Sequence, residues 1–450
     1  MNDKREQLVI CGALRTPFCF GNRLSPYRSE RLLAAVLTDL LAKYGLDAGL
    51  IDTIVAGSVQ QDTKAPNVAR ISALLAGFPD SVNAHTVQSN CNSTFLSLLT
   101  CMGNILLGSS DCAIAGGVES MSNFGYRLHP KTNEYGSVLD IENALNQSGA
   151  AFLNDFDIVD CLEEGLKDSV NDMSMIEIAE IMANLFGVTR AEQDAYTRSM
   201  LERAVEATDR KKLQGYLTPV GDVTQDTYPL NRKRMLKRPD SFAKAPAVFA
   251  ADSEFITAAQ FMKKHGTFLH DLGFENSEIS PTVTMYNSCI PGDGAGVCIV
   301  TTEEKARELR LTPLLRIISW GTAGVNPVVM GIGPNEAVHL ALTQPKTERA
   351  RNIELDDMHQ IEIHEAFASQ VLSVFKQSEV KYNRPWHRDK VNVYGGTLAY
   401  THPLGSTNIR LITNILSRFE ELPAARYALA TCCAGGGQGA AFVFERYRKD

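Results

Sequence analysis

The segment Ser89-Asn90-Cys91-Asn92-Ser93-Thr94 follows a short β-branched run, Ala84–Gln88, and precedes a helical pattern of apolar residues from Phe95 to Leu106. The run predicts a strand, and the spacing after it predicts a buried helix. Because Asn and Ser favour helix starts, we place Cys91 at the N-terminus of that helix. Unpaired N–H groups and the helix dipole there favour a thiolate. Cys91 is therefore a candidate nucleophile, although a lone cysteine in apolar surroundings is more often a small core residue.

The composition is that of an ordinary globular protein. The chain has 450 residues, 44% of them hydrophobic and 21% charged, which predicts two or three domains. A net charge of −8 argues against a nucleic-acid partner. No apolar run approaches the roughly 18 residues of a membrane span, and neither end of the chain resembles a targeting signal. Ten cysteines without zinc-site spacing predict reduced thiols, no metal site and a cytoplasmic location, or a mitochondrial one for a mature eukaryotic form.

Alternating apolar strands and helices occupy both ends of the chain, with a different region between them. We predict an N-terminal α/β half over 1–124 and a C-terminal half over 281–450. The region 125–280 has few strand signals, apart from a candidate strand over Pro219–Val223, and part of it is expected to return to the N-terminal half near 240–280. Two helices are predicted there, over Met175–Leu185 and Arg190–Thr208. The second begins with a capping box formed by Thr189 and Glu192.

The segment 250–280 alternates apolar and basic residues, which suggests an amphipathic helix broken at Gly266. The favoured interpretation is a helix that covers its own protein. The alternative is a helix that docks a partner or a membrane surface.

Four stretches combine reactive residues with turns that could present them. The first contains Cys91, and the second is a strand that ends at His364. The others are Gly395–Gly405, which contains His402, and Thr431–Gly439, which contains Cys433. A histidine at a strand end is more often structural, and a glycine turn is more often a plain loop. Together, however, these residues suggest carbon–carbon chemistry on an acyl thioester, with a thiolate, a proton acceptor, a second acid/base and glycine N–H groups for an oxyanion.

These four stretches, with Gly116–Ser122, Arg15–Pro17 and Glu192–Tyr196, resemble the thiolase family in the family's own order along nearly the whole chain. The resemblance implies an α/β, five-layered αβαβα fold of two similar halves with an inserted helical loop domain. It also implies that the substrates are acyl-CoA and CoA, that no further cofactor is needed, and that the protein is a homodimer or homotetramer.

The resemblance assigns roles residue by residue. Cys91 would accept the acyl group, His402 would activate it, and Cys433 would act as acid/base on the α-carbon. The N–H groups of Cys91 and Gly435 would hold one oxyanion, and His364 with His402 the other. His364 stands where many members have Asn, and it resembles the thiolase component of fatty-acid β-oxidation complexes. The residues expected on the CoA-binding side are Met175, Ser288 and Cys289.

Several positions depart from the family pattern. Thr94 and Thr401 stand where glycine is usual, and Thr407-Asn408 replaces Ser-Gly. Cys289 and Ile290 take the places of Ser and Gly, and Ser174 that of His. Each change adds bulk or alters a polar contact near the substrate, so acyl specificity is the property they affect first.

The leading hypothesis is an acetyl-CoA C-acyltransferase, a 3-ketoacyl-CoA thiolase of fatty-acid β-oxidation. The alternatives are a short-chain acetoacetyl-CoA thiolase, a ketosynthase-like condensing enzyme, which Cys433 disfavours, and a sterol-carrier-like scaffold without activity. Segment 250–280 and His364 suggest docking to a hydratase/dehydrogenase subunit.

Overall fold

Nine strands of the computed structural model are hydrogen-bonded to one another in the order β3-β2-β4-β7-β1-β8-β11-β10-β9. The structure describes residues 4–21, 23–132, 137–238, 240–250, 256–275 and 278–448. The strands are β1 (Leu8–Arg15), β2 (Thr53–Gly57), β3 (Asn83–Val87), β4 (Cys112–Ser120), β7 (Asp293–Thr302), β8 (Leu315–Gly324), β9 (Met358–Ile363), β10 (Tyr427–Ala434) and β11 (Gln438–Arg446). The order divides into two halves, because β1 and β8 are joined only through the pairs Val9–Arg316 and Ile10–Leu315.

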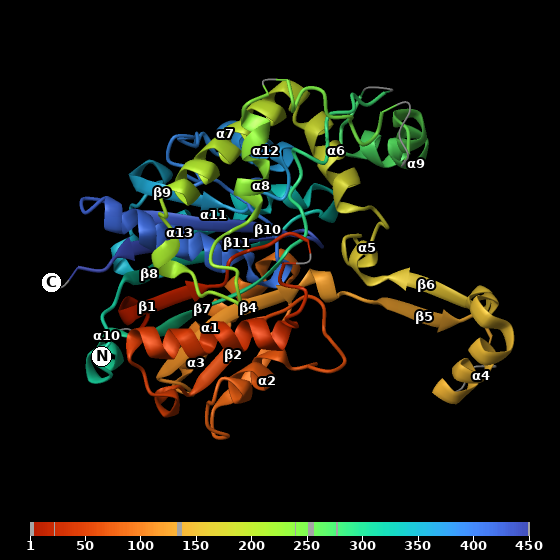
Figure 1. The fold of residues 1–450 in the computed structure, drawn as a ribbon. Coiled ribbons are helices and arrows are strands. Elements are labelled where there is room, and N and C mark those ends of the chain that lie inside the picture. The colour runs from red at the N-terminus through yellow and green to blue at the C-terminus, as the bar shows by residue number, and fades with distance from the viewer. Residues whose placement is uncertain are drawn as a thin grey trace.

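Helices separate and cover these two halves (Figure 1). The helices are α1 (Ser29–Tyr44), α2 (Val68–Leu75), α3 (Ser93–Leu107), α10 (Glu303–Glu308), α11 (Gly333–Thr343), α12 (Ala368–Tyr382) and α13 (Thr407–Glu421). Side chains of α3 and α13 share one core with strands of both halves. A second core joins α1 and α2 to the other face of the first half, and a third joins α11 and α12 to the second half. The expected five layers, helix–strand–helix–strand–helix, are therefore confirmed.

The strands are buried on both faces, which explains why they appear in the sequence as unbroken apolar runs. All residues of β1, β4 and β7 are buried. The strand β7 lies between β4 and β1, so residues 293–302 belong to the first half of the fold. The C-terminal half, expected to begin at 281, therefore begins after residue 302. The segment that returns to the first half is 293–302, which comes later in the chain than the expected 240–280. The sequence could not show this, because both halves have the same alternation of strands and helices.

The inserted region carries α5 (Cys161–Gly165), α6 (Met175–Leu185), α7 (Arg190–Asp209), α8 (Tyr228–Leu236) and α9 (Ala258–Asp271). The predicted helices agree with α6 and α7, and the Thr189–Glu192 capping box is confirmed. Pro219–Val223 forms only an isolated bridge, so the strand expected there is wrong.

Helix α9 runs through Gly266 without a break, against expectation, because a Thr257–Gln260 capping box and buried contacts hold it on both sides of the glycine. Its residues Phe261 and Leu269 pack in a core with α6. This face covers the protein itself, as the favoured interpretation required. Residues 251–255 and 276–277 of the segment lie outside the described residues.

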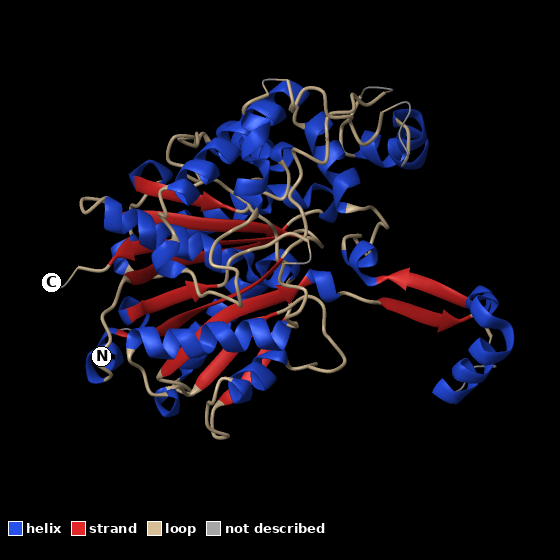
Figure 2. Cartoon of the chain, in the orientation of Figure 1, coloured by secondary structure: helices blue, strands red, loops and turns tan. Residues whose placement is uncertain are grey.

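An arm that the sequence did not predict extends from the body (Figures 1 and 2). It consists of the antiparallel pair β5 (Tyr126–Pro130) and β6 (Phe156–Asp160) with α4 (Val138–Ser148) at its tip. All five residues of β5 are exposed, and its apolar–polar alternation spans only five residues and ends at Pro130, a residue that argues against a strand. Among the described helices, none has the length and apolar character needed to cross a membrane.

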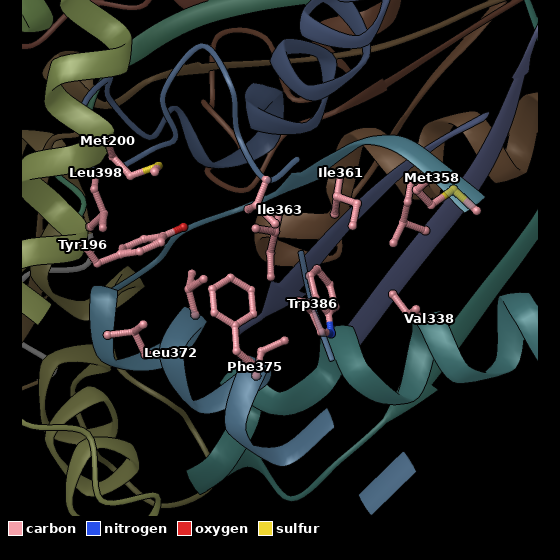
Figure 3. Close-up of a cluster of buried hydrophobic side chains, with 14 of the residues drawn as sticks. Tyr196, Met200, Val338, Met358, Ile361, Ile363, Leu372, Phe375, Trp386 and Leu398 are labelled. Atoms are coloured by element: carbon pink, nitrogen blue, oxygen red, sulfur yellow. The ribbon is translucent and has the colours of Figure 1, made fainter. Parts of the chain in front are cut away.

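The third core fixes strand β9 in place. Ile361 and Ile363 are fully buried, and Figure 3 shows them among aromatic and aliphatic side chains of neighbouring helices and loops. The residues drawn around them include Tyr196, Met200, Leu372, Phe375, Trp386 and Leu398. Because β9 ends at Ile363, this packing positions His364 directly after the strand.

Candidate active site

Cys91 lies in a tight turn between β3 and α3, as the sequence predicted. The turn depends on Asn90, which has a positive φ of 47°, a conformation that Asn tolerates better than most residues. The Asn90 side chain donates to the carbonyl oxygen of Gly435 at 2.9 Å. The nucleophile turn is thereby joined to the glycine loop that follows β10.

His402 lies against the sulfur of Cys91, with Nε2 and Sγ 3.1 Å apart. Its main-chain N–H donates to the oxygen of Ile290 at 2.8 Å, which anchors the histidine loop to a second loop. The Thr407 hydroxyl donates to Pro403 O at 3.1 Å and lies 2.6 Å from His402 Nδ1. Because the hydroxyl proton is donated to Pro403 O, the hydroxyl oxygen accepts a hydrogen bond from His402 Nδ1–H. His402 Nε2 therefore presents a lone pair to the Cys91 thiol.

Both groups of this pair are uncharged at neutral pH. Burial raises the pKa of Cys91 to about 12, although hydrogen bonds from backbone N–H groups, Gly435 first, act in the opposite direction. Burial, followed by the charge of Arg410, lowers the pKa of His402 to about 3. Burial therefore works against the thiolate expected at the helix N-terminus, because desolvation opposes the helix dipole. The geometry instead suits transfer of the thiol proton to His402 during attack.

His364 is fully buried beside His402, with ring centroids 4.2 Å apart and the rings tilted by 33°. Its Nδ1 lies 3.1 Å from the Thr397 hydroxyl. Its Nε2 has no hydrogen-bond partner among the residues that the structure describes. Burial, followed by the repulsion that a second imidazolium at His402 would exert and by the charge of Arg410, holds the pKa of His364 well below its usual value, so this imidazole is also neutral.

Cys433 and Cys289 bring two more thiols to the same place. Cys433 is fully buried near the end of β10. Burial raises its pKa well above the ordinary value, and the neighbouring thiols of Cys91 and Cys289 act in the same direction, because thiolates this close would repel one another. Burial and then Cys91 likewise raise the pKa of Cys289. The structure thus assembles Cys91, His402, His364 and Cys433 from four separate stretches, with Cys289 as an additional neighbour.

Two residues near the nucleophile show roles that sequence reasoning missed. The Glu119 carboxylate accepts N–H groups from Val59, Gln60 and Gly405 at 2.9 to 3.1 Å, and burial raises its pKa to about 7. The Thr94 hydroxyl, one turn after Cys91, donates to Gly405 O at 2.6 Å. Both therefore hold the loop after His402 against the nucleophile helix. A charged residue inside the buried run Cys112–Ser120 was the available signal for Glu119.

Comparison with known proteins identifies the family. Residues 8–263 match the model of the thiolase N-terminal domain, and residues 311–446 match that of the C-terminal domain. The chain belongs to the thiolase family. It is 33% identical over 444 residues to an acetyl-CoA acetyltransferase of Allochromatium vinosum, a match that covers 98% of this chain and 99% of that protein.

Solved structures agree with this assignment. A Bacillus anthracis acetyl-CoA acetyltransferase superposes with a TM-score of 0.77 at 28% identity, covering 98% of this chain and 99% of that one. Human mitochondrial 3-ketoacyl-CoA thiolase gives a TM-score of 0.78 at 26% identity, covering 99% and 100%.

The residues expected on the CoA-binding side of this thiolase lie at two places. Met175 begins α6, and its Sδ would lie 3.6 Å from a Cβ built on Gly435, so it borders the glycine loop. Ser288 is buried and its hydroxyl donates to Thr284 O at 2.7 Å, so this hydroxyl proton is already used within the protein. The N–H of Cys289 donates to Ala366 O at 2.9 Å. Their CoA contacts remain predictions.

The structure explains the departure at Thr401. A Cβ built on Gly292 would lie 2.3 Å from the Thr401 hydroxyl oxygen, so the threonine fits because its neighbour is a glycine.

The ligand atoms of Cys91, His364 and His402 lie within 4.8 Å of one another, and among the described residues this group could hold a metal ion. A bound ion would need the Cys91 thiolate and a lone pair from each histidine.

Proposed function

We propose that this thiolase is an acyltransferase that cleaves 3-ketoacyl-CoA with CoA, giving acetyl-CoA and a shortened acyl-CoA, as in fatty-acid β-oxidation. The observation that carries the proposal is the 3.1 Å contact between Cys91 Sγ and the lone pair of His402 Nε2, with the Cys433 thiol nearby. A thiol, a base and a second acid/base thiol are the groups that this chemistry needs.

In the first half of the reaction, His402 takes the proton from Cys91, and the sulfur attacks the 3-keto carbon. The bond between C2 and C3 then breaks. The acyl group stays on Cys91, and the electron pair passes to the acetyl-CoA enolate, which takes a proton from Cys433. His364 Nε2 and His402 stabilise the enolate oxygen, and the N–H groups of Cys91 and Gly435 stabilise the oxyanion on the acyl carbon.

In the second half, the Cys433 thiolate takes the proton of the incoming CoA thiol. The CoA sulfur attacks the Cys91 thioester, and the acyl-CoA leaves. Cys91 regains its proton from His402, so the enzyme returns to its starting state. No metal or redox group enters these steps.

Thiolysis of a series of 3-ketoacyl-CoA substrates, from four carbons to long chains, tests this function. Activity that rises with chain length supports the β-oxidation role. Activity confined to four carbons favours a short-chain thiolase, the alternative suggested by the acetyl-CoA acetyltransferase names of the relatives. Absence of cleavage at every length, with no acylation of Cys91 detectable as a mass increase, contradicts the proposal. Cys91→Ala is the matched control for both readouts.

A further inference from the structure

The hydroxyl of Thr397 links His364 to a buried arginine. Thr397 Oγ1 lies 3.1 Å from His364 Nδ1 and accepts a hydrogen bond from Arg410 Nη2 at 3.0 Å. It also receives the main-chain N–H of Glu365 at 3.5 Å. All three side chains, Thr397, His364 and Arg410, are fully buried, so water does not compete for these contacts.

The donors around Thr397 decide the direction of its own hydroxyl proton. A threonine hydroxyl has one proton to donate and two lone pairs to accept with. Arg410 cannot accept a hydrogen bond, and neither can the Glu365 N–H, so both use lone pairs of the oxygen. If His364 Nδ1 also carried a proton, three donors would face one oxygen and the hydroxyl proton would have no acceptor. The hydroxyl therefore donates to Nδ1.

We propose that Arg410, acting through Thr397, is a positioning residue that fixes His364 as the Nε2–H tautomer and so makes it a hydrogen-bond donor toward Cys91 and His402. Two observations agree with this assignment. His364 Nε2 is buried and has no partner within the described part of the chain, so the proton that it carries remains available to a substrate oxygen. The neighbouring His402 has the opposite tautomer, because Thr407 holds a proton on its Nδ1.

The two adjacent imidazoles thus have different roles. His402 offers a lone pair that can take the thiol proton, and His364 offers an N–H that can stabilise a negative oxygen. Two threonines decide this difference, Thr407 for one ring and Thr397 for the other. Arg410 is required because a threonine alone could equally accept a hydrogen bond from Nδ1–H. The proton of His364 would then be on Nδ1, and the lone pair on Nε2 would face the oxyanion and repel it.

Arg410 keeps a positive charge in the protein interior, which costs desolvation free energy. Its guanidinium is fully buried, donates to Thr397 and to Gly395 O at 3.3 Å, and lies 5.3 Å from the ring centroid of Tyr400. Burial lowers the pKa of Arg410, and the carboxylates of Glu362 and Glu365 oppose this by favouring its charged form. A buried cation is expensive unless it is well paired. Among the described residues, Thr397 is the only one whose side chain accepts a hydrogen bond from Arg410.

Nitrogen NMR of the whole protein labelled with ¹⁵N-histidine tests the tautomer directly. The resonances of His364 are assigned by their loss in His364→Asn. In the wild type at neutral pH we expect Nε2 to be protonated and Nδ1 to be unprotonated. A protonated Nδ1 would overturn the proposal. This measurement needs neither substrate nor turnover, so it decides the tautomer even if the proposed function fails.

A matched pair of variants tests the consequence, which rests on the proposed function. Thr397→Ser keeps the hydroxyl, and Thr397→Val replaces it with a methyl group of similar size. We expect Thr397→Val to slow the exchange of acetyl-CoA α-protons with deuterated solvent by about 10²-fold, the loss typical of removing one oxyanion donor. Acylation of Cys91 by acetyl-CoA, which releases CoA and forms no enolate, should change far less when it is followed by mass, and Thr397→Ser should resemble the wild type.

Two kinetic outcomes would overturn the inference. One is equal exchange rates in Thr397→Val and Thr397→Ser. The other is a loss of acylation as large as the loss of exchange, because that indicates a distorted site and not a misplaced proton. If wild-type protein showed neither acylation nor thiolysis, the proposed function would fail, whereas the NMR result would still stand.

Discussion

His402 can take the Cys91 proton only while its Nε2 carries a lone pair, and Thr407 is the residue that keeps the proton on Nδ1. We therefore expect Thr407→Val to lower the rate of thiolysis by about 10²-fold, the lower end of what general base catalysis contributes. Thr407→Ser keeps the hydroxyl and should retain most of the activity. Steady-state kinetics on both variants, with melting temperatures to confirm folding, would measure this. Equal activity in the two variants would show that the hydroxyl does not control the tautomer.

Thr401 and Gly292 illustrate how a departure from the family pattern is accommodated by the residue opposite. A methyl group at residue 292 would lie within 2.5 Å of both Thr401 Oγ1 and Cβ, and 2.9 Å from Cys19 O. Gly292→Ala should therefore lower the free energy of unfolding by about 1 to 3 kcal/mol, the usual cost of overpacking.

Thr401→Gly in the same chain should restore part of that loss, with the Cys19 contact accounting for the remainder. Denaturant unfolding of the two single variants and the double variant forms a thermodynamic cycle. Strictly additive effects would mean that the two residues do not interact.

At the scale of secondary-structure elements, α6 and α9 are joined by polar contacts as well as by apolar packing. Burial on its own would raise the pKa of Glu177, but hydrogen bonds from His265, the Ser174 N–H and Lys264 outweigh it, and the pKa falls from 4.5 to about 2. His265 Nε2 and Lys264 Nζ lie 2.9 and 3.1 Å from the Glu177 carboxylate. The charged carboxylate is therefore favoured by folding.

Because the folded pKa is the lower one, Glu177 contributes stability above about pH 4.5 and loses it as the pH falls toward 2. Glu177→Gln should be less stable than the wild type by roughly 1 to 3 kcal/mol at neutral pH. The difference should shrink as the pH falls through that window. Free energies of unfolding measured at several pH values would show this convergence. A difference that does not change with pH would mean that the ionised form is not the stabilising one.

At the scale of the whole molecule, the sequence predicted what depends on local patterns and missed what depends on packing between distant segments. The helix after Cys91, the strand before His364 and the Thr189 cap follow from periodicity and capping, and the structure contains all three. The arm was missed because each of its strands is only five residues long and β5 ends at a proline. Arg410 was missed because its role exists only where α13 meets the loop that contains Thr397.

The arm itself suggests how the molecule assembles. Leu128 and Ile158 are register partners on one face of β5 and β6, and they are 40% and 51% exposed. A two-stranded ribbon is marginal on its own, and an apolar face that water reaches is a common mark of an interface. The expected homodimer or homotetramer would give this face a partner, namely a second copy of the chain.

We therefore expect Ile158→Glu to reduce the oligomer mass measured by light scattering after size-exclusion chromatography, because a charge on this face has to be desolvated when two copies meet. His129→Glu is the matched control, since His129 is exposed on the opposite face of the same ribbon. Melting temperatures should stay close to the wild type if the arm contributes little to the body of the fold. A wild type that is monomeric, or an oligomer mass that Ile158→Glu leaves unchanged, would show that this face of the arm does not hold the copies together.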